Sequence, residues 1–148
     1  MSTWTEVTGI IICDWFSFSY PDKDKVKNDF VKRQLKINKV LHKGLPSGSE
    51  TKLQTGYVKN NINRIIITGS LRDFNNEDIN NIISPWWNYI IENLGFIRQA
   101  VMSCTCNRKT HIFEKRIAHD ADLGEHLLEL YGSDPGIIVH SNREVNKI

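Results

Sequence analysis

The chain begins with a β-branched and aromatic run over residues 7–16, whose centre is apolar at both odd and even positions. Apolar side chains on both faces are typical of a strand covered on both sides, so this run predicts a central or well-covered strand. Tyr20-Pro21-Asp22 ends it as a turn, because proline fixes φ and aspartate bonds back to its own backbone.

Between residues 24 and 43 the apolar spacing changes to that of a helix. The stripe that recurs near helical period consists of Val26, Phe30, Ile37, Val40 and Leu41. Val31 and Leu35 lie at its edges, and Gly44 follows where a helix commonly ends in a left-handed residue. We therefore expect an amphipathic helix in this segment.

A hairpin is predicted in the next part of the chain. The loop over 45–50 is rich in proline, glycine and serine, and residues 53–59 follow it with the pattern of a half-exposed strand. Asn60-Asn61 is suited to a turn, and the β-branched run over 63–69 predicts the second strand of the hairpin.

A second helix is expected after Asn75, which can cap it together with Asp78 three residues later. Its apolar stripe consists of Ile79, Ile82, Ile83, Trp86, Ile90 and Leu94, and Gly95 ends it. Ser84-Pro85 interrupts the pattern. The pair either starts a new helix or kinks this one.

The remaining segments complete the order of elements. Residues 96–106 and 110–117 predict two strands joined by a turn at 107–109, while 123–131 predicts a short helix and the last ten residues a peripheral strand or arm. Strand, helix, two strands, helix and strand in this order favour an α+β fold, a ferredoxin-like (split βαβ) sandwich with an antiparallel-rich sheet and an extra hairpin strand. We expect one domain over 1–117 and a C-terminal extension over 118–148.

Composition narrows the class of protein. The chain has 148 residues, of which 40% are hydrophobic and 24% charged. These values exclude collagen, coiled-coil, low-complexity and disulfide-scaffold proteins, and no apolar run approaches the roughly 18 residues of a membrane span. The three cysteines are an odd number and residues 1–6 lack the features of a signal peptide, so a cytoplasmic protein with reduced thiols and no membrane contact is expected.

The net charge of +2 is the sum of two halves of opposite charge. Residues 1–74 contain 12 basic and 7 acidic residues, a balance of +5, whereas residues 75–148 contain 7 and 10, a balance of −3. A polarised surface favours a charged partner more than the net charge suggests.

The first candidate for ligand or partner contact is the loop that contains Ser47, Gly48, Ser49 and Glu50. Successive small residues let backbone N–H groups converge on an anion. However, the spacing is not that of a Walker A loop, and Glu50 stands where that motif needs lysine. An ordinary connecting loop and a binding loop both remain open.

Arg72 and Asp73 lie between a predicted strand and a capped helix, where ligand sites often form in α/β units. An Arg–Asp pair that holds the turn is one interpretation. The other is a site in which the Arg72 guanidinium binds a carboxylate or phosphate through two hydrogen bonds.

The helix over 24–43 is basic, with eight lysine or arginine residues against two aspartates between residues 23 and 43. Lys32, Arg33, Lys36 and Lys39 could neutralise phosphates of a nucleic acid. No aromatic residues alternate with these cations to stack on bases, so a solvated helix face is the simpler interpretation.

Neither a metal site nor a cofactor site is predicted. The acidic and histidine residues at His119, Asp120, Asp122, Glu125 and His126 lack the spacing of known zinc motifs, and Cys104 and Cys106 have no second pair. Cys13, Cys104 and Cys106 lie in apolar strands, where cysteine is usually inert. A hydrolase that uses one of them with His111 is an alternative, but no motif indicates it.

Trp86 and Trp87 are adjacent, and neighbouring helical positions point in directions about 100° apart. We therefore expect one ring to be buried and the other to cover a neighbouring element or to remain at the surface. An exposed tryptophan is enriched in binding hot spots, so this pair is a candidate contact with a partner or a second copy.

Three strings carry a resemblance to a known group: WTEVTGII at 4–11, LPSGSE at 45–50 and GSLRDF at 69–74. They resemble small accessory proteins of phages and prophages of low-GC Gram-positive bacteria, over about residues 4–116. The resemblance implies a non-enzymatic binding protein acting on a host protein in the cytosol of the host cell, such as an inhibitor of a CRISPR–Cas or nucleotide-signalling defence. A nucleic-acid-binding or nucleotide-binding module and a small hydrolase are the alternatives.

Overall fold

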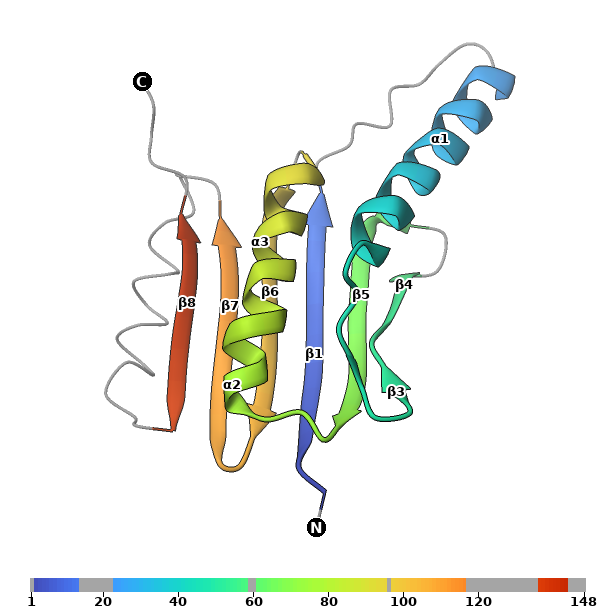
Figure 1. Ribbon diagram of the computed structural model, residues 1–148. Helices are drawn as coiled ribbons and strands as arrows, with labels where there is room; N and C mark the ends of the chain where they lie inside the picture. The colour runs from blue at the N-terminus through green and yellow to red at the C-terminus, as the bar shows by residue number, and fades with distance from the viewer. Residues whose placement is uncertain (1, 14–22, 59–60, 96, 117–135, 144–148) are drawn as a thin grey trace.

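The computed structural model describes residues 2–13, 23–58, 61–95, 97–116 and 136–143, and it shows an α+β chain with one large sheet (Figure 1). The elements in chain order are β1 (Trp4–Cys13), α1 (Lys23–His42), β2 (Ser47–Gly48), β3 (Thr51–Lys52), β4 (Gln54–Val58), β5 (Asn61–Arg72), α2 (Asn76–Asp78), the π-helical turn η1 (Ile79–Ile83), α3 (Ser84–Asn93), β6 (Ile97–Cys106), β7 (Lys109–Arg116) and β8 (Ile137–Arg143). No helix in this part of the chain is long and apolar enough to cross a bilayer.

The sheet has six strands in the order β4-β5-β1-β6-β7-β8. Neighbouring strands are antiparallel, apart from β7 and β8, which run parallel, so the sheet is mixed. The strand that begins the chain is therefore central, as its two-sided apolar pattern predicts. Both main helices lie on the same face of the sheet (Figure 1).

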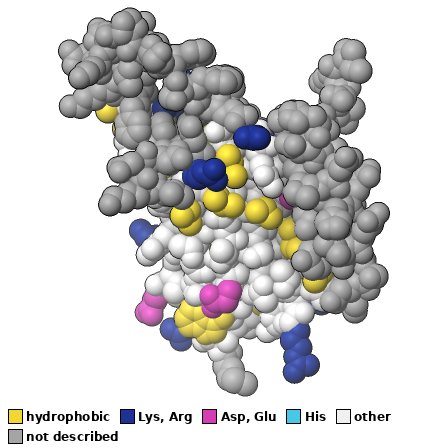
Figure 2. Space-filling model, turned by 180° about the vertical axis from the view of Figure 1, so that it is seen from behind, with side chains coloured by type: hydrophobic (Ala, Val, Ile, Leu, Met, Phe, Trp, Pro, Cys, Tyr) yellow, Lys and Arg dark blue, Asp and Glu magenta, His cyan; other side chains and the backbone are white. Residues whose placement is uncertain are grey.

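Alternation along β1 determines which residues form the core. Thr5, Val7, Gly9, Ile11 and Cys13 are buried on the helical side, while the residues between them point to the opposite face. Buried side chains from β5, β6 and both helices complete one core cluster. Figure 2 shows the opposite face, where most of the described surface is neither acidic nor basic.

Helix α1 confirms the predicted amphipathic helix. Ile37, Val40 and Leu41 are buried, and Gly44 has φ +68°, the left-handed conformation expected after its end. Val31 and Leu35, the residues at the edges of the stripe, are exposed.

The second helical segment is continuous through Ser84-Pro85. Asn75 and Asp78 form the predicted capping box, in which each side chain accepts a hydrogen bond from the other residue's backbone N–H. The π-helical turn that follows has more residues per turn than an α-helix and so shifts the apolar register. Ile82, predicted to belong to the apolar stripe, is consequently exposed while Ile83 is buried.

Trp86 and Trp87 are both buried. Of the two alternatives predicted for the second ring, exposure at the surface is therefore wrong, and contact with a neighbouring element is observed. Helix α3 lies beside α1 on one face of the sheet, so one direction around it leads to α1 and another to the sheet (Figure 1). Trp86 Nε1 donates to the Leu41 carbonyl of α1 at 3.0 Å, whereas the Trp87 ring lies 6.2 Å from that of Phe113 on β7. In this structure neither ring can form an exposed contact surface.

The predicted hairpin of β6 and β7 is present, with Asn107 and Arg108 at positive φ in its turn. Strand β8 forms the edge of the same sheet. The short helix predicted over 123–131 and the residues His119, Asp120, Asp122, Glu125 and His126 lie outside the described residues.

Candidate functional site

Two of the predicted binding segments, far apart in the sequence, meet at the end of β5. The loop over 45–50 forms most of a small hairpin, β2 and β3, that packs against the last residue of β5. The Ser49 backbone N–H donates to the Arg72 carbonyl at 2.9 Å, and the Arg72 backbone N–H donates to Thr51 Oγ1 at 2.9 Å. These two hydrogen bonds position the hairpin tip beside the Arg72 side chain.

Gly48 is required by this close approach. A Cβ at this position would lie 2.2 Å from the Arg72 carbonyl oxygen and 2.7 Å from its nitrogen. Because these are backbone atoms, they cannot move aside as the end of a side chain can. The small residues of the loop thus allow the hairpin to pack on β5. The Ser49 N–H, one of the groups considered for anion binding, is already used in this packing.

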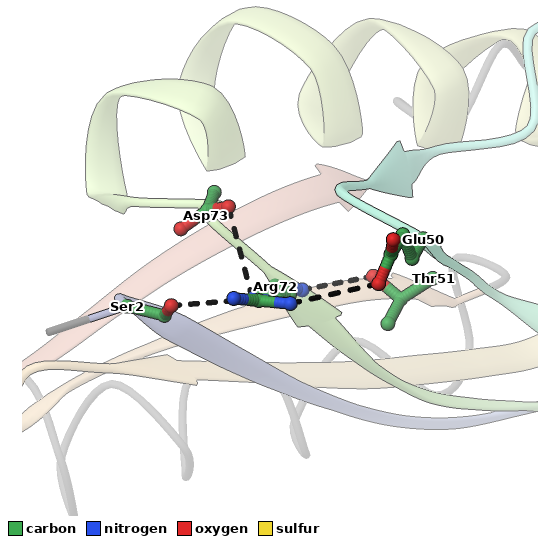
Figure 3. A network of polar contacts seen from close by, with 5 residues as sticks. All are labelled: Ser2, Glu50, Thr51, Arg72 and Asp73. Carbon is green, nitrogen blue, oxygen red and sulfur yellow. Dashed lines mark hydrogen bonds and ion pairs between the residues drawn. The ribbon is translucent and has the colours of Figure 1, made fainter.

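The Arg72 guanidinium is surrounded by polar groups from three segments (Figure 3). Its Nε donates to Ser2 Oγ at 3.2 Å and lies 3.9 Å from Asp73 Oδ2, and its Nη1 lies 3.6 Å from Glu50 Oε2. We call Ser2, Glu50, Thr51, Arg72 and Asp73 the Arg72 junction. The side chains of Arg72, Asp73 and Glu50 are 42%, 50% and 87% exposed, so the junction is open to solvent.

The backbone holds this exposed junction in place. Glu50 and Asp73 have φ of 59° and 56°, the left-handed region that sharp turns use. Just after Asp73, the Phe74 N–H donates to the Thr3 carbonyl at 3.3 Å, and the buried Thr5 hydroxyl donates to the Phe74 carbonyl at 2.6 Å. The start of β1 is thereby fixed to the turn that follows β5.

Sequence reasoning missed Trp4 as part of this surface. Trp4 is directly opposite Arg72 in the β1–β5 pairing, and residues so paired have side chains on the same face of a sheet. Its ring is 45% exposed. Two residues further along the same face, the Ser70 hydroxyl donates to Glu6 Oε2 at 2.5 Å. The alternation of β1 could have indicated this, since Trp4 is out of phase with the inward residues Val7 and Ile11.

The charges at this surface are unfavourable for an anion. The Arg72 guanidinium is already paired with two carboxylates, those of Glu50 and Asp73. A third carboxylate, that of Glu6, lies on the same face of β1 as Trp4 and accepts from Ser70. The prediction that Arg72 could hold a phosphate through two hydrogen bonds therefore receives no support from its surroundings. Figure 2 shows hydrophobic, acidic and basic side chains together at the end of the sheet where β1 begins.

The remaining predicted residues are divided between the junction hairpin, α1 and the core. Ser47 and Ser49 are exposed on the hairpin of the junction. Lys32, Lys36 and Lys39 are exposed on α1 and Arg33 is half-buried there, while Trp86 and Trp87 belong to the core.

The cysteines do not have the environment of nucleophiles. Cys13, Cys104 and Cys106 are buried, and burial raises the pKa of the Cys104 thiol to about 12. Cys104 is directly opposite His111 in the β6–β7 pairing, but at neutral pH it is a protonated thiol, which is a poor nucleophile. Among the described residues, no group of three or more histidine, cysteine, aspartate or glutamate side chains is arranged to hold a metal ion.

Comparison with known proteins identifies no family for this chain. No protein-family model and no curated protein sequence matches it. Among solved structures, it is similar to an amidase of the hydantoinase/carbamoylase family from Burkholderia phymatum, with TM-score 0.36 and 10% identity over 98% of this chain and 37% of the other. A second amidase of that family, from Burkholderia ambifaria, has TM-score 0.31 and 12% identity over 97% and 34% of the two chains. The chain spans about a third of the length of these amidases, and neither fold nor activity is transferred from them.

Proposed function

We propose that this chain is a non-enzymatic binding protein that recognises a protein partner through the Arg72 junction and the adjacent Trp4 and Glu6. The observation that carries the proposal is the exposed pairing of Trp4 with Arg72, with exposed fractions of 45% for Trp4 and 42% for the Arg72 side chain. Tryptophan and arginine are the residue types most enriched in binding hot spots.

Rigidity of the surface supports this function. The hairpin of β2 and β3 and the start of β1 are both held by backbone hydrogen bonds to residues 72–74. A surface that is already ordered loses little conformational entropy on binding, which leaves more of the contact energy as affinity.

The local charges favour a protein over a nucleic acid at this surface. With the guanidinium of Arg72 paired to Glu50 and Asp73, and with Glu6 on the adjacent strand, this surface repels a phosphate backbone and attracts basic side chains. The resemblance to phage accessory proteins makes the partner class a host protein of an antiviral defence, which the chain would inhibit by occupying its surface in the host cytosol.

We also propose that β1, α1, β4, β5, α3 and β6 form a ferredoxin-like split βαβ sandwich. The order β4-β5-β1-β6 supports this assignment, because β1 lies between two strands that are both antiparallel to it. Strands β7 and β8 then extend this unit at one edge.

Capture of a partner tests the function. Tagged protein would be crosslinked in lysate of a bacterial host, and the bound proteins identified by mass spectrometry. Trp4→Ala is expected to lose a protein that the unchanged chain captures. Ile82→Ala is the matched control, since Ile82 is 40% exposed but lies on η1, away from β1. Equal capture by Trp4→Ala and the unchanged chain would contradict the proposal.

A nucleic acid is the second candidate, and α1 favours it. Lys32, Lys36 and Lys39 are exposed and spaced so that they share one helix face, and residues 30–49 contain no acidic residue. Reversing these three charges should abolish binding to DNA or RNA and remove its steep salt dependence. Undetectable binding to both polymers at low salt would eliminate this candidate.

A further inference from the structure

A chain of polar side chains connects the helical layer to the edge strand of the sheet. On α2, Asn76 Nδ2 donates to the Cys106 carbonyl at 3.4 Å. Asn76 Oδ1 lies 3.1 Å from His111 Nε2, and His111 Nδ1 lies 3.1 Å from His140 Nε2 on β8. His111 is almost fully buried, with 1% exposure, while His140 is half-buried.

The partners determine where the protons lie. Asn76 Oδ1 is an acceptor, so His111 Nε2 must carry a proton and donate to it. The neutral His111 ring then has an unprotonated Nδ1, which accepts from the N–H of His140 Nε2. The arrangement is satisfied when both rings are neutral and each carries its proton on Nε2.

Ring geometry shows that this contact is a hydrogen bond. The two imidazole planes differ by 17°, and their centres are 5.4 Å apart. That separation equals the N···N distance plus the two ring radii, so both nitrogens lie between the ring centres and face one another. Two histidines sharing a tetrahedral metal would instead aim their lone pairs at a point beside the line joining the nitrogens. His140 also stacks on Phe113 with centres 4.2 Å apart and planes 5° apart.

The surroundings oppose protonation. Burial lowers the pKa of His111 to about 4, with further contributions from His140 and from Lys109 on β7. Burial also lowers the pKa of His140. Among the described groups packed nearby, β6 contributes the uncharged Cys104 opposite His111, and the next charged residue on this face of β7 is the cation Lys115.

We propose that the His111–His140 hydrogen bond is a proton-sensitive latch that fastens edge strand β8 to β7. A proton added to His111 Nδ1 would face the N–H of His140, replacing an acceptor with a second donor. A proton added to His140 Nδ1 would place a charge in a half-buried site between Phe113 and His111. Opening β8 exposes both rings to water and relieves either situation, so acidification favours the open form.

The direction of the pH effect follows from the lowered pKa values. In the open form each histidine regains its ordinary pKa of about 6.5, so the open form binds protons first as the pH falls. The latch is at full strength above about pH 6.5 and weakens as the pH falls towards 4. When the titration of His111 alone is considered, the equilibrium constant for opening β8 should be roughly 30-fold larger at pH 5 than at pH 7.5.

The opening that acid favours is specific to β8 because β8 lies at the edge of the described sheet. Among the described strands, β8 is paired on one side, with β7, whereas β1 and β6 are paired on both sides. Release of β8 would uncover the N–H and C=O groups along β7, which is the kind of edge that pairs with an extended segment of another chain.

Hydrogen exchange tests the latch. Protection factors of the β8 amides, referred to the intrinsic exchange rate at each pH, should fall roughly 30-fold from pH 7.5 to pH 5. The amides of the central strand β1 should remain more protected than those of β8 at both pH values, because β8 opens without global unfolding. The double variant His111→Leu/His140→Phe removes both titrating rings and should lose this pH dependence. His42→Gln, which replaces an exposed histidine 3.3 Å from Thr55 on β4, should retain it.

Two results would overturn the latch. One is unchanged β8 protection between pH 7.5 and 5 in the unchanged chain, and the other is the same loss in the double variant. A second measurement does not depend on the variants folding: nitrogen-15 NMR of the histidine rings should show both as neutral Nε2–H forms at pH 7.5. A His111 ring that titrates near pH 6.5 would contradict the proposal.

Discussion

Tryptophan occurs in two opposite environments in this protein, exposed at Trp4 and buried at Trp86 and Trp87. Trp4 stands on the outward phase of β1 and is 45% exposed beside Arg72, while Trp86 and Trp87 are almost fully buried. The pair is buried because α3 contacts α1 on one side and the sheet on another, so that two faces of the helix are covered. Position in the layers, and not the residue type, decides which tryptophan is available to a partner.

The largest expected effect is the loss of stability when a buried tryptophan, rather than the exposed one, is removed. Trp87→Ala removes a fully buried ring that packs against Phe113, and it should lower the free energy of unfolding by about 3–5 kcal/mol. Trp4→Ala should lower it by less than about 1 kcal/mol, because the Trp4 ring remains partly in water in the folded state. Urea denaturation of the two variants measures both values. Equal losses would mean that the two sites do not differ as described.

An intermediate effect is expected at the base of the Arg72 junction. Gly48→Ala places a Cβ against the Arg72 backbone, so the hairpin of β2 and β3 must move away, at a cost of about 2 kcal/mol. Gly56→Ala is the control, since nothing lies within 4 Å of a Cβ built there. Denaturation gives the cost, and amide NMR shifts of residues 49–51 report the displacement. A Gly48→Ala protein with normal stability and shifts would show that this close approach is absent.

A smaller effect distinguishes the two buried tryptophans from one another. Trp86→Phe leaves the Leu41 carbonyl without its side-chain donor, which should cost about 1 kcal/mol more than Trp87→Phe. The Trp87 Nε1–H has no hydrogen-bond partner among the described residues, so its replacement loses none there. Paired denaturation curves test this difference, and a larger loss for Trp87→Phe would reverse the assignment.

The smallest effect on stability is expected for the residue most important to the proposed surface. Arg72→Ala removes ion pairs of 3.6 and 3.9 Å between exposed groups, and such pairs contribute less than about 1 kcal/mol. The same variant should weaken binding of the captured partner much more than it weakens folding. A stability loss of several kcal/mol would indicate instead that Arg72 serves the fold.

Local signals made much of the fold predictable. The helix over 24–43, the left-handed Gly44, the capping box of Asn75 and Asp78 and the turn before Lys109 each depend on residues close in the sequence. The shifted register at Ile82 was not predictable in this way, because an α-helical period was assumed where η1 has a wider turn. Burial of Trp86 and Trp87 likewise depended on α1 and the sheet covering two sides of α3, which adjacent helical positions do not reveal.

The candidate site was predictable only in pieces. The glycine and serine content of the loop marked Gly48 as part of a candidate site. Arg72 was a candidate because it lies between a predicted strand and a capped helix. Their contact is between residues about twenty positions apart, and it depends on how a hairpin folds back onto a strand end. Trp4 joins them from the start of the chain through the register of β1 and β5, which a single sequence does not specify.

The affinity of the captured partner for three purified proteins tests the central claim most directly. If the Arg72 junction with Trp4 and Glu6 is the binding surface, Trp4→Ala should raise the Kd at least about 30-fold, the change that a hot spot of 2 kcal/mol produces. Ile82→Ala, with a similarly exposed apolar side chain on η1, should leave the Kd within about threefold of the unchanged chain. A Trp4→Ala protein that binds as tightly as the unchanged chain would contradict the account.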